Sequence, residues 1–437
     1  HKLSTVSQQE SRFNGHVIVE ISAPDAPFIV VTVEALMRKM ELLIHRKLHP
    51  IMGVVLSAEK EIEAVISPEE KMEKFDHLYL EIEADADIVF LKRLETLIAG
   101  HMLAVQLVRN HRQKMLQSLA SMQTEIESVS AVSADTKGEW SKLCGWLKLD
   151  NFTVMGFITF LEQDSASADI IKTVENSGHG ILATEYLEKT TNKLLNVLTA
   201  QLWKRRHSDF PFALDRVRFP SPVLRFENLM ILSLRIPDAK LGMVEHVFLG
   251  LLRGSSLNVK NTETPLIHQK MRYIFENRNM LQNSYDYNEV VRIFGATPKF
   301  ELFRSSRKEL IQICDDLLSV NNPNKIHCFQ IETRVSGVLK LMVVMPTSLL
   351  NEEAIEQTAD FLKAKIPHQN CEWFEARGSE KSRLHFEFEL QEDLQGKSDL
   401  PSFDLLQLEG EISGLIKPWE TQLRELLRNQ HPGEEGA

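Results

Sequence analysis

The sequence predicts a multidomain α+β protein, and three observations support this fold class. The chain has 437 residues, which at about 100–200 residues per domain is enough for two to four domains. Hydrophobic residues make up 43% of the chain and charged residues 25%, the balance of a globular protein with several apolar cores. Near both ends, strand-like runs alternate with segments whose apolar residues have helical spacing.

The first strand and helix pattern lies within residues 16–128. Residues 16–23 are rich in β-branched side chains and predict a strand. A turn follows in which Asp25 can cap the next helix and Pro27 suits its first helical turn. The further elements expected here are a helix at 28–40, a strand at 41–56 interrupted near His49-Pro50, a strand at 77–84, and a helix that starts near Leu91 and continues through 102–128. The order β-α-β-β-α is a ferredoxin-like plan.

Residues 59–87 form an acidic stretch, with eleven Asp and Glu residues against three lysines. We interpret this stretch as a solvated loop and sheet edge, because charge runs usually face water. A cation site is the alternative interpretation.

The centre of the chain is a mixed α+β region. The polar residues 128–138 predict a linker, and Trp140, Leu143 and Trp146 mark a short helix after it. The further elements expected are strands at 152–161, 223–235 and 243–252, with a turn at 237–240 between the last two, and helices at 264–276, 286–295 and 305–320.

The last unit opens after Asn321-Asn322-Pro323-Asn324, a run of turn-forming residues. The elements expected here are strands at 326–334 and 338–346 joined by a tight turn at 335–337, a helix at 351–365 capped by Asn351, strands at 370–377 and 383–390, and a long helix at 402–428. The predicted domain limits are therefore 1–128, 139–321 and 322–428, with a disordered tail at 429–437.

Charge and cysteine content restrict the partners and the compartment. The formal net charge is -11, so we expect no nucleic-acid or anionic-membrane partner. Four cysteines are scattered without a CxxC pair, which favours a reducing cytoplasm over a disulfide framework. No apolar run reaches the ~18 residues of a membrane span. Because His1 is not an initiator Met, we expect the chain to begin inside a longer reading frame or to be trimmed.

The sequence contains no motif for cofactor or catalytic chemistry. GxGxxG, GxxxxGK[ST], GxSxG and HExxH are all absent, so we expect no catalytic residue and no cofactor-binding residue in this chain. His45 and His49 lie on a predicted strand, where a structural role is favoured over a metal site. We expect His16 and His77, at the heads of two strands, to lie close together without a third metal ligand. We also expect Ser255 and Ser256 to be structural, His385 to face a strand neighbour, and Lys204-Arg205-Arg206-His207 to be a solvated helix end.

Several segments together resemble one family, the large NAD-specific glutamate dehydrogenases of bacteria. The segments that carry the resemblance are Asp25-Ala26-Pro27-Phe28-Ile29-Val30 with His49-Pro50, Asn151-Phe152-Thr153-Val154-Met155-Gly156-Phe157, Ser177-Gly178-His179-Gly180-Ile181-Leu182, Phe248-Leu249-Gly250-Leu251, Thr297-Pro298-Lys299-Phe300-Glu301-Leu302-Phe303, Val343-Val344-Met345-Pro346 and Arg383-Leu384-His385-Phe386. Their order holds across residues 16–427, the extent of the resemblance.

The chain departs from the family pattern at several polar positions. Val31-Thr32 stands where the family has Asp-Ser, Met40 replaces a glycine, and Thr347 replaces an arginine. Gly53-Val54-Val55 replaces the basic pair that follows His-Pro. Polar groups that the family pattern offers as candidate ligand contacts are therefore partly missing here.

The resemblance implies an amino-terminal, non-catalytic region built mainly from ferredoxin-like ACT-type units, at 1–128, within 139–321 and at 322–428. In ACT units an Asp-x-Pro-Gly turn faces the ligand, and the corresponding residues here are Asp25, Ala26, Pro27 and Phe28. Phe28 replaces the glycine, and its side chain should block close backbone approach to a ligand. These four residues are the candidate effector turn, with a purely architectural role as the alternative.

The resemblance also implies what the parent protein does. A dehydrogenase domain would lie downstream and use NAD to convert L-glutamate to 2-oxoglutarate and ammonia. The present region would set subunit contacts in a homo-oligomer and tune that domain, with an amino acid as a possible effector. A free-standing ACT-type amino-acid sensor without enzyme activity is the alternative.

Overall fold

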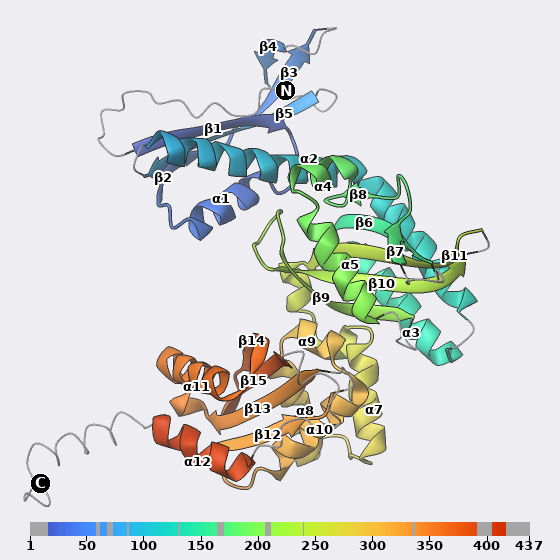
Figure 1. Ribbon diagram of the computed structural model, residues 1–437, viewed down its shortest axis with the longest axis vertical. Helices are drawn as coiled ribbons and strands as arrows, with labels where there is room; N and C mark the ends of the chain where they lie inside the picture. The colour runs from blue at the N-terminus through green and yellow to red at the C-terminus, as the bar shows by residue number, and fades with distance from the viewer. Residues whose placement is uncertain are drawn as a thin grey trace, which may run out of the picture. The chain divides into compact units, whose positions relative to one another are not determined.

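The computed structural model describes residues 16–57, 62–67, 73–84, 87–129, 132–163, 170–205, 211–238, 240–333, 337–390 and 404–416. The chain forms two compact units, residues 1–259 and 260–437. Figure 1 shows three sheets, each with helices packed beside it. The predicted α+β class with ferredoxin-like units is confirmed.

The first sheet lies at the start of the first unit. Its elements are β1 (His16–Pro24), α1 (Ile29–Lys39), β2 (Ile44–Leu48), β3 (Ile51–Leu56), β4 (Ile62–Ile66), β5 (Glu73–Glu83) and α2 (Ile88–Glu125). The strand order is β1-β5-β3-β4, and β2 also pairs with β5. Burial alternates along β1 because Val17, Val19 and Ile21 face the core and their neighbours face outward. Figure 1 shows α1 and α2 lying beside this sheet.

The predicted break at His49-Pro50 is confirmed, since it separates β2 from β3. The loop predicted for 59–87 is wrong in part. Residues 62–66 form β4, and β5 begins at Glu73, within the acidic stretch. The described side chains of β4 are exposed at the edge of the sheet, as expected, whereas β5 lies inside the sheet and its Asp76 is buried. Alternation in so short and charged a segment was too weak to identify the strand.

The second sheet completes the first unit. Its elements are α3 (Ala134–Trp146), β6 (Phe152–Gln163), β7 (Ile170–Thr173), β8 (His179–Gly180), α4 (Thr184–Lys189), α5 (Lys193–Arg205), β9 (Phe212–Pro220), β10 (Asn228–Asp238), β11 (Gly242–Leu252) and α6 (Gly254–Leu257). The strand order is β7-β6-β11-β10-β9, and β8 also pairs with β6. The strands predicted at 152–161, 223–235 and 243–252 are confirmed within a few residues. The predicted linker 128–138 is too long, because α3 already begins at Ala134 with Ser133 as its cap.

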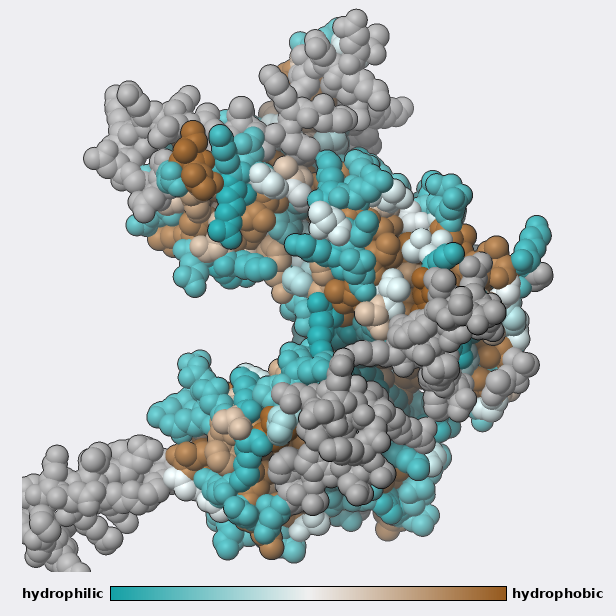
Figure 2. Space-filling view, in the orientation of Figure 1, coloured by the Kyte–Doolittle hydropathy of each residue, from teal (hydrophilic) through white to brown (hydrophobic). Residues whose placement is uncertain are grey.

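The long helix α2 packs against elements of both halves of the first unit. Its 38 residues pack on α1 and then on β6 and β8 of the second sheet. Its buried side chains recur from Leu94 to Met122. Hydrophobic residues gather on the surface at its amino-terminal end (Figure 2), where Ile88 and Val89 are 66% and 69% exposed. Among the described helices, α2 included, none has an apolar run suited to crossing a bilayer.

The second unit begins with a helical segment. It comprises α7 (Ile267–Asn277), α8 (Tyr285–Ala296), α9 (Lys299–Arg304) and α10 (Arg307–Ser319). Ser306 and Glu309 form a capping box that starts α10. Lys270 fastens α7 to the end of α9, since its Nζ donates to the carbonyl oxygens of Leu302, Phe303 and Ser305 at 2.7–2.8 Å. The predicted helices are confirmed, and α9 is an additional short one.

The last sheet follows within the second unit. Its elements are β12 (His327–Ile331), β13 (Val338–Pro346), α11 (Glu352–Lys365), β14 (His368–Ala376), β15 (Lys381–Leu390) and α12 (Leu405–Leu415). The antiparallel order is β12-β13-β15-β14. From β13 onward the chain follows the ferredoxin-like order, and β12 occupies the outer position beside β13. The turn at 335–337 lies mostly outside the described residues, as do the end of the predicted final helix and the tail 429–437.

Helices cover both faces of this last sheet. On one face Leu341, Phe386 and Phe388 pack with residues of α11 and α12 in one hydrophobic core. On the other face, charged side chains contact the helical segment. One terminal nitrogen of Arg304 donates to both carboxylate oxygens of Glu387 at 2.7 and 2.8 Å, and Lys340 pairs with Glu309 at 2.7 Å.

The predicted domain limits do not coincide with the two compact units. The helical segment was assigned to 139–321, yet it belongs with the last sheet in the unit 260–437. Both sheets of the first part lie in the unit 1–259. Whether 1–128, 139–321 and 322–428 act as separate domains stays a prediction.

Candidate functional site

The β1–α1 turn, Asp25–Phe28, has an unusual backbone. Phe28 precedes α1 with φ 82° and ψ -2°, a left-handed conformation that favours glycine. Phe28 therefore adopts a backbone conformation that glycine takes without strain. Such a residue costs about 1–2 kcal/mol and persists only where its surroundings enforce it.

Asp76, not Asp25, holds the turn through its side chain. The backbone N–H of Ala26 donates to Asp76 Oδ2 at 3.3 Å, and His49 Nε2 lies 2.9 Å from Asp76 Oδ1. Burial raises the pKa of Asp76, although these hydrogen bonds oppose the shift. The prediction that Asp25 caps α1 is wrong, because α1 has no side-chain cap and Asp25 contributes its backbone N–H to Lys74 O.

The turn is also fixed to the rest of the first unit. Gln106 of α2 donates to the carbonyl oxygen of Pro24 at 2.9 Å. Thr32 Oγ1 accepts from the backbone N–H of Leu224 at 2.9 Å. Thr32, one of the departures from the family pattern, therefore has a structural role on α1.

A cavity of about 350 Å³ lies beside this turn, and we call it the basic pocket. Its apolar lining is Pro27, Phe28, Val108, Leu116, Phe152 and Val154. Its polar lining is Arg109, Arg112, Lys148, Asp150, Thr153 and Arg253. The β1–α1 turn, α2, the helical turn before β6, the start of β6 and the residue after β11 thus each contribute side chains. The volume lies in the range of small-molecule sites.

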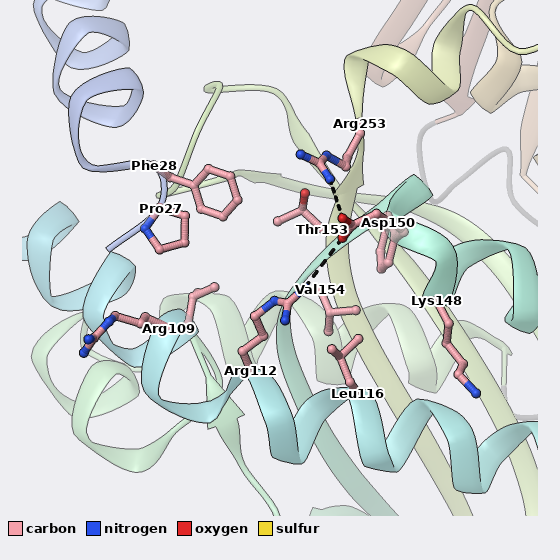
Figure 3. Close-up of a pocket in the computed structure, with 12 residues that line it drawn as sticks. Pro27, Phe28, Arg109, Arg112, Leu116, Lys148, Asp150, Thr153, Val154 and Arg253 are labelled. Carbon is pink, nitrogen blue, oxygen red and sulfur yellow. Dashed lines mark ion pairs between the residues drawn. The ribbon is translucent and has the colours of Figure 1, made fainter. Parts of the chain in front are cut away.

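Opposite charges meet in the middle of the basic pocket. Asp150 lies 2.9 Å from a guanidinium nitrogen of Arg253 and 3.6 Å from one of Arg112. Figure 3 shows both arginines reaching toward Asp150, whereas the charged ends of Arg109 and Lys148 point away from it. The lining thus contains four basic side chains and one carboxylate, which leaves an excess of positive charge.

The local backbone explains how Asp150 and Arg253 come together. Asp150 has φ 65°, which ends the helical turn before β6. The next residue, Asn151, accepts at its carbonyl oxygen from the backbone N–H of Arg253 at 3.1 Å and from Ser256 Oγ at 2.9 Å. The two chain segments are thus joined one residue from the ion pair, and Ser256 has the structural role predicted for it.

A glycine on β11 allows β6 to approach closely beside the basic pocket. The pairing of β6 with β11 shifts by one residue between Leu249 and Gly250. A Cβ at Gly250 would lie 2.2 Å from the carbonyl oxygen of Thr153, which is too close for any other residue. Gly250 therefore helps to place Phe152 and Thr153 in the lining.

The structure brings together only part of the predicted site. Pro27 and Phe28 line the basic pocket, whereas Asp25 and Ala26 are not among its lining residues. Sequence reasoning missed Arg112, Asp150 and Arg253. Arg112 follows Arg109 at helical spacing on α2, and this was the only local signal for a basic face.

Other candidates from the sequence have structural partners. His16 stacks on His45 at 4.5 Å and His77 contacts Ser22. The pairing of β1 with β5 places His16 opposite Glu83 and His77 opposite Ser22, so the two histidines are not adjacent. His385 stacks on Phe374 at 4.5 Å, as a strand histidine facing a neighbour. Within the described ranges, no group of three His, Cys, Asp or Glu residues is arranged to hold a metal ion. The side chains of Lys204-Arg205-Arg206-His207 lie outside the described residues.

Comparisons with known proteins agree with the resemblance. The model of the glutamate dehydrogenase ACT1 domain matches residues 4–98, and that of glutamate dehydrogenase helical motif 1 matches residues 264–322. The NAD-specific glutamate dehydrogenase of Pseudomonas aeruginosa is 22% identical over 419 residues, which is 94% of this chain and 25% of that protein. The NAD-specific glutamate dehydrogenase of Halomonas elongata is 19% identical over 425 residues, again 25% of its length.

The fold and these matches define a chain that combines an ACT domain with a helical motif. The first sheet with α1 lies in the ACT1 match, and α7 to α10 lie in the helical-motif match. Together, the two family models and the two relatives support an amino-terminal region of the NAD-specific glutamate dehydrogenase family. It spans about a quarter of the length of the curated relatives it matches.

Proposed function

We propose that this chain is the non-catalytic regulatory and assembly region of an NAD-specific glutamate dehydrogenase. The parent protein would oxidise L-glutamate to 2-oxoglutarate and ammonia with reduction of NAD. The observation that carries the proposal is the ACT1 match over the first sheet, whose β1–α1 turn lines the basic pocket. A pocket that joins two sheets is suited to sensing a ligand and changing the packing between them.

The chemistry of the described side chains supports a non-catalytic role. Burial raises the pKa values of Cys144, Cys314 and Cys328 to about 12, which keeps these thiols protonated and unreactive at neutral pH. Burial lowers the pKa of Lys270 to about 7, a value that suits a catalytic lysine. However, its Nζ is engaged by three carbonyl oxygens and joins two helices.

The proposal names partners that lie outside this chain. A dehydrogenase domain downstream would carry the NAD site and the active site, and the matched relatives are about four times longer than the segment they share. We propose a homo-oligomer in the cytoplasm, with this region making part of the contacts. The exposed Ile88 and Val89 at the start of α2 support such a contact, since paired apolar side chains in water favour burial.

The size of the native protein in its source cells tests this proposal. An antibody raised against this region should detect a species far larger than 50.0 kDa. That species, once immunopurified, should reduce NAD in a glutamate-dependent reaction, while the isolated region should not. A band at the mass of the region itself, without this activity, would favour a free-standing amino-acid sensor.

A further inference from the structure

We propose that the basic pocket binds a small ligand with two acidic groups, and that Asp150 occupies the place of one of these groups when the ligand is absent. This inference rests on the proposed function, because it names the ligand class of the regulatory region. The ligand would exchange one of its carboxylates for that of Asp150 on Arg112 and Arg253.

The charges in the pocket carry the first step. Two guanidinium groups converge on the carboxylate of Asp150 from α2 and from the end of β11. Guanidinium groups pair with carboxylates through parallel N–H donors, so this pair of arginines forms a carboxylate site. Arg109 and Lys148 add positive charge at the rim, where they can attract the second acidic group.

The exposure of the ion pairs carries the second step. The side chains of Asp150 and Arg112 are 68% and 61% exposed, and that of Arg253 is 43% exposed. Ion pairs between such exposed groups contribute little to stability, because water solvates the separated charges. Asp150 can therefore leave the arginines at small cost, and a ligand carboxylate can take its place.

The shape of the pocket favours a carbon skeleton over an inorganic anion. Phe28, Leu116 and Val154 form apolar walls next to the arginines. A cavity of about 350 Å³ is larger than a phosphate ion needs and accommodates a dicarboxylate with a short carbon chain. Apolar contact along this chain would add to the two charge interactions.

The position of the pocket carries the regulatory step. Phe28 belongs to the turn of the first sheet, Arg112 to α2, which packs on elements of both parts of the first unit, and Arg253 directly follows β11 of the second sheet. A dicarboxylate that spans these residues would hold the two sheets of the first unit in one arrangement. It would act on a distant site only by binding that arrangement more tightly than others.

Calorimetry with the full 437-residue chain at low ionic strength tests the proposal, because salt screens exposed charges. The probes are succinate, L-glutamate, L-glutamine and inorganic phosphate. We expect succinate and L-glutamate to bind, and L-glutamine and phosphate to bind about tenfold more weakly. L-glutamine lacks the second carboxylate, and phosphate lacks the carbon chain that makes the apolar contact. Equal binding of phosphate and succinate would mean a general anion patch and would overturn the dicarboxylate assignment.

Four variants assign the roles of the side chains. Arg112→Gln and Arg253→Gln should each weaken succinate binding about tenfold, because each removes a charge-assisted contact. Asp150→Asn should strengthen binding about threefold, since it removes the competing carboxylate, and Asn tolerates the φ of 65° at this position. Arg93→Gln, an exposed arginine on α2 outside the pocket lining, is the matched control and should leave succinate binding nearly unchanged.

The results separate the pocket from the proposed function. If neither Arg112→Gln nor Arg253→Gln weakened succinate binding, the pocket assignment would be overturned. The same would hold if Asp150→Asn did not strengthen binding. If the immunopurified native protein lacks glutamate-dependent NAD reduction while the variant pattern holds, the proposed function falls and the dicarboxylate site stands. If the native protein has this activity and succinate does not bind, the dicarboxylate site falls and the proposed function stands.

Discussion

In the first sheet β5 lies between β1 and the pair β2/β3, and in the last sheet β15 lies between β13 and β14. The two sheets therefore share the same three-strand order, with α1 and α11 in equivalent connections. In the last sheet β12 adds a strand beside β13. Among the described residues of the first sheet, no strand pairs with the outer edge of β1.

The turns before α1 and α11 also differ, since only the second is held by side-chain hydrogen bonds of its own residues. The turn before α11 is capped by Asn351, which accepts from the backbone N–H of Ala354 at 2.8 Å, and Thr347 Oγ1 donates to Gly378 O at 3.0 Å. The turn before α1 has no side-chain cap and contains the left-handed Phe28. The same strand order thus contains two different turns. In the last sheet the polar groups of the turn are hydrogen-bonded, and in the first sheet the turn has backbone strain and lies beside a pocket. We therefore assign a stabilising role to the turn before α11 and a ligand-responsive role to the turn before α1.

The largest expected effect is on the last sheet, where Arg383 is buried against the helical segment. Its guanidinium donates to Ile293 O at 2.8 Å, to Thr297 Oγ1 at 2.5 Å and to His385 Nε2 at 3.1 Å. Arg383→Met should lower the free energy of unfolding of this unit by about 3 kcal/mol, because it leaves buried acceptors without a donor. Hydrogen exchange along β15, followed by mass spectrometry, measures the loss.

Arg377→Met is the control for this variant. Arg377 is 52% exposed and pairs with Glu375 at 3.0 Å, so its replacement should change the free energy of unfolding by less than about 0.5 kcal/mol. Equal effects of the two variants would contradict a stabilising role for the buried contacts of Arg383.

The next largest expected effect on the free energy of unfolding comes from removing the charged contacts of Glu387. Although burial opposes it, the charges of Arg304 and Lys340 hold the pKa of Glu387 below its ordinary value of 4.5. The pKa of Glu309 is likewise lowered by Lys340 against the effect of burial. These carboxylates stabilise the fold at pH above 4.5, and the contribution disappears as the pH falls through their lowered pKa values.

Glu387→Gln should therefore destabilise the second unit by about 2 kcal/mol at pH 7 and reduce its loss of stability in acid. Urea unfolding at a series of pH values from neutral to acid measures both effects. Glu356→Gln, on the exposed face of α11, is the control and should follow the wild-type pH profile. A parallel profile for Glu387→Gln would show that this carboxylate is not coupled to folding.

The strained turn of the first sheet gives a smaller effect with an unusual order. Phe28→Gly and Phe28→Ala both remove the ring, but only glycine adopts φ 82° without strain. Phe28→Gly should be more stable than Phe28→Ala by about 1–2 kcal/mol. Thermal unfolding of the two variants compares them directly.

The equivalent turn before α11 provides the contrast. Leu349 has no positive φ, so Leu349→Ala should be at least as stable as Leu349→Gly. If alanine were also favoured at residue 28, the backbone strain in the β1–α1 turn would be absent in solution.

The smallest expected effect concerns the aspartate of the β1–α1 turn. Asp25→Ala should change the free energy of unfolding by less than about 0.5 kcal/mol, because the Asp25 side chain does not cap α1. Asp76→Asn should cost about 1–2 kcal/mol, since the buried Asp76 carboxylate holds both Ala26 and His49. Chemical unfolding of both variants tests this, and the reverse order would restore Asp25 as the residue that holds the turn.

The sequence by itself determined the elements whose signals are local. Alternation of apolar residues predicted β13 and β15, and helical spacing predicted α7, α8 and α10 close to their observed limits. The break between β2 and β3 also followed from the sequence, because proline cannot donate to a strand ladder. These features depend on a few neighbouring residues, and such residues carry the same preferences in any context.

Tertiary structure alone decided the basic pocket. Arg112, Asp150 and Arg253 are far apart in the sequence and meet only because α2 packs beside β6 and β6 pairs with β11. The same holds for Asp76, which reaches the turn across the pairing of β1 with β5. Local patterns report which face of an element is buried, whereas a cavity depends on which elements meet, and that is set by long-range packing.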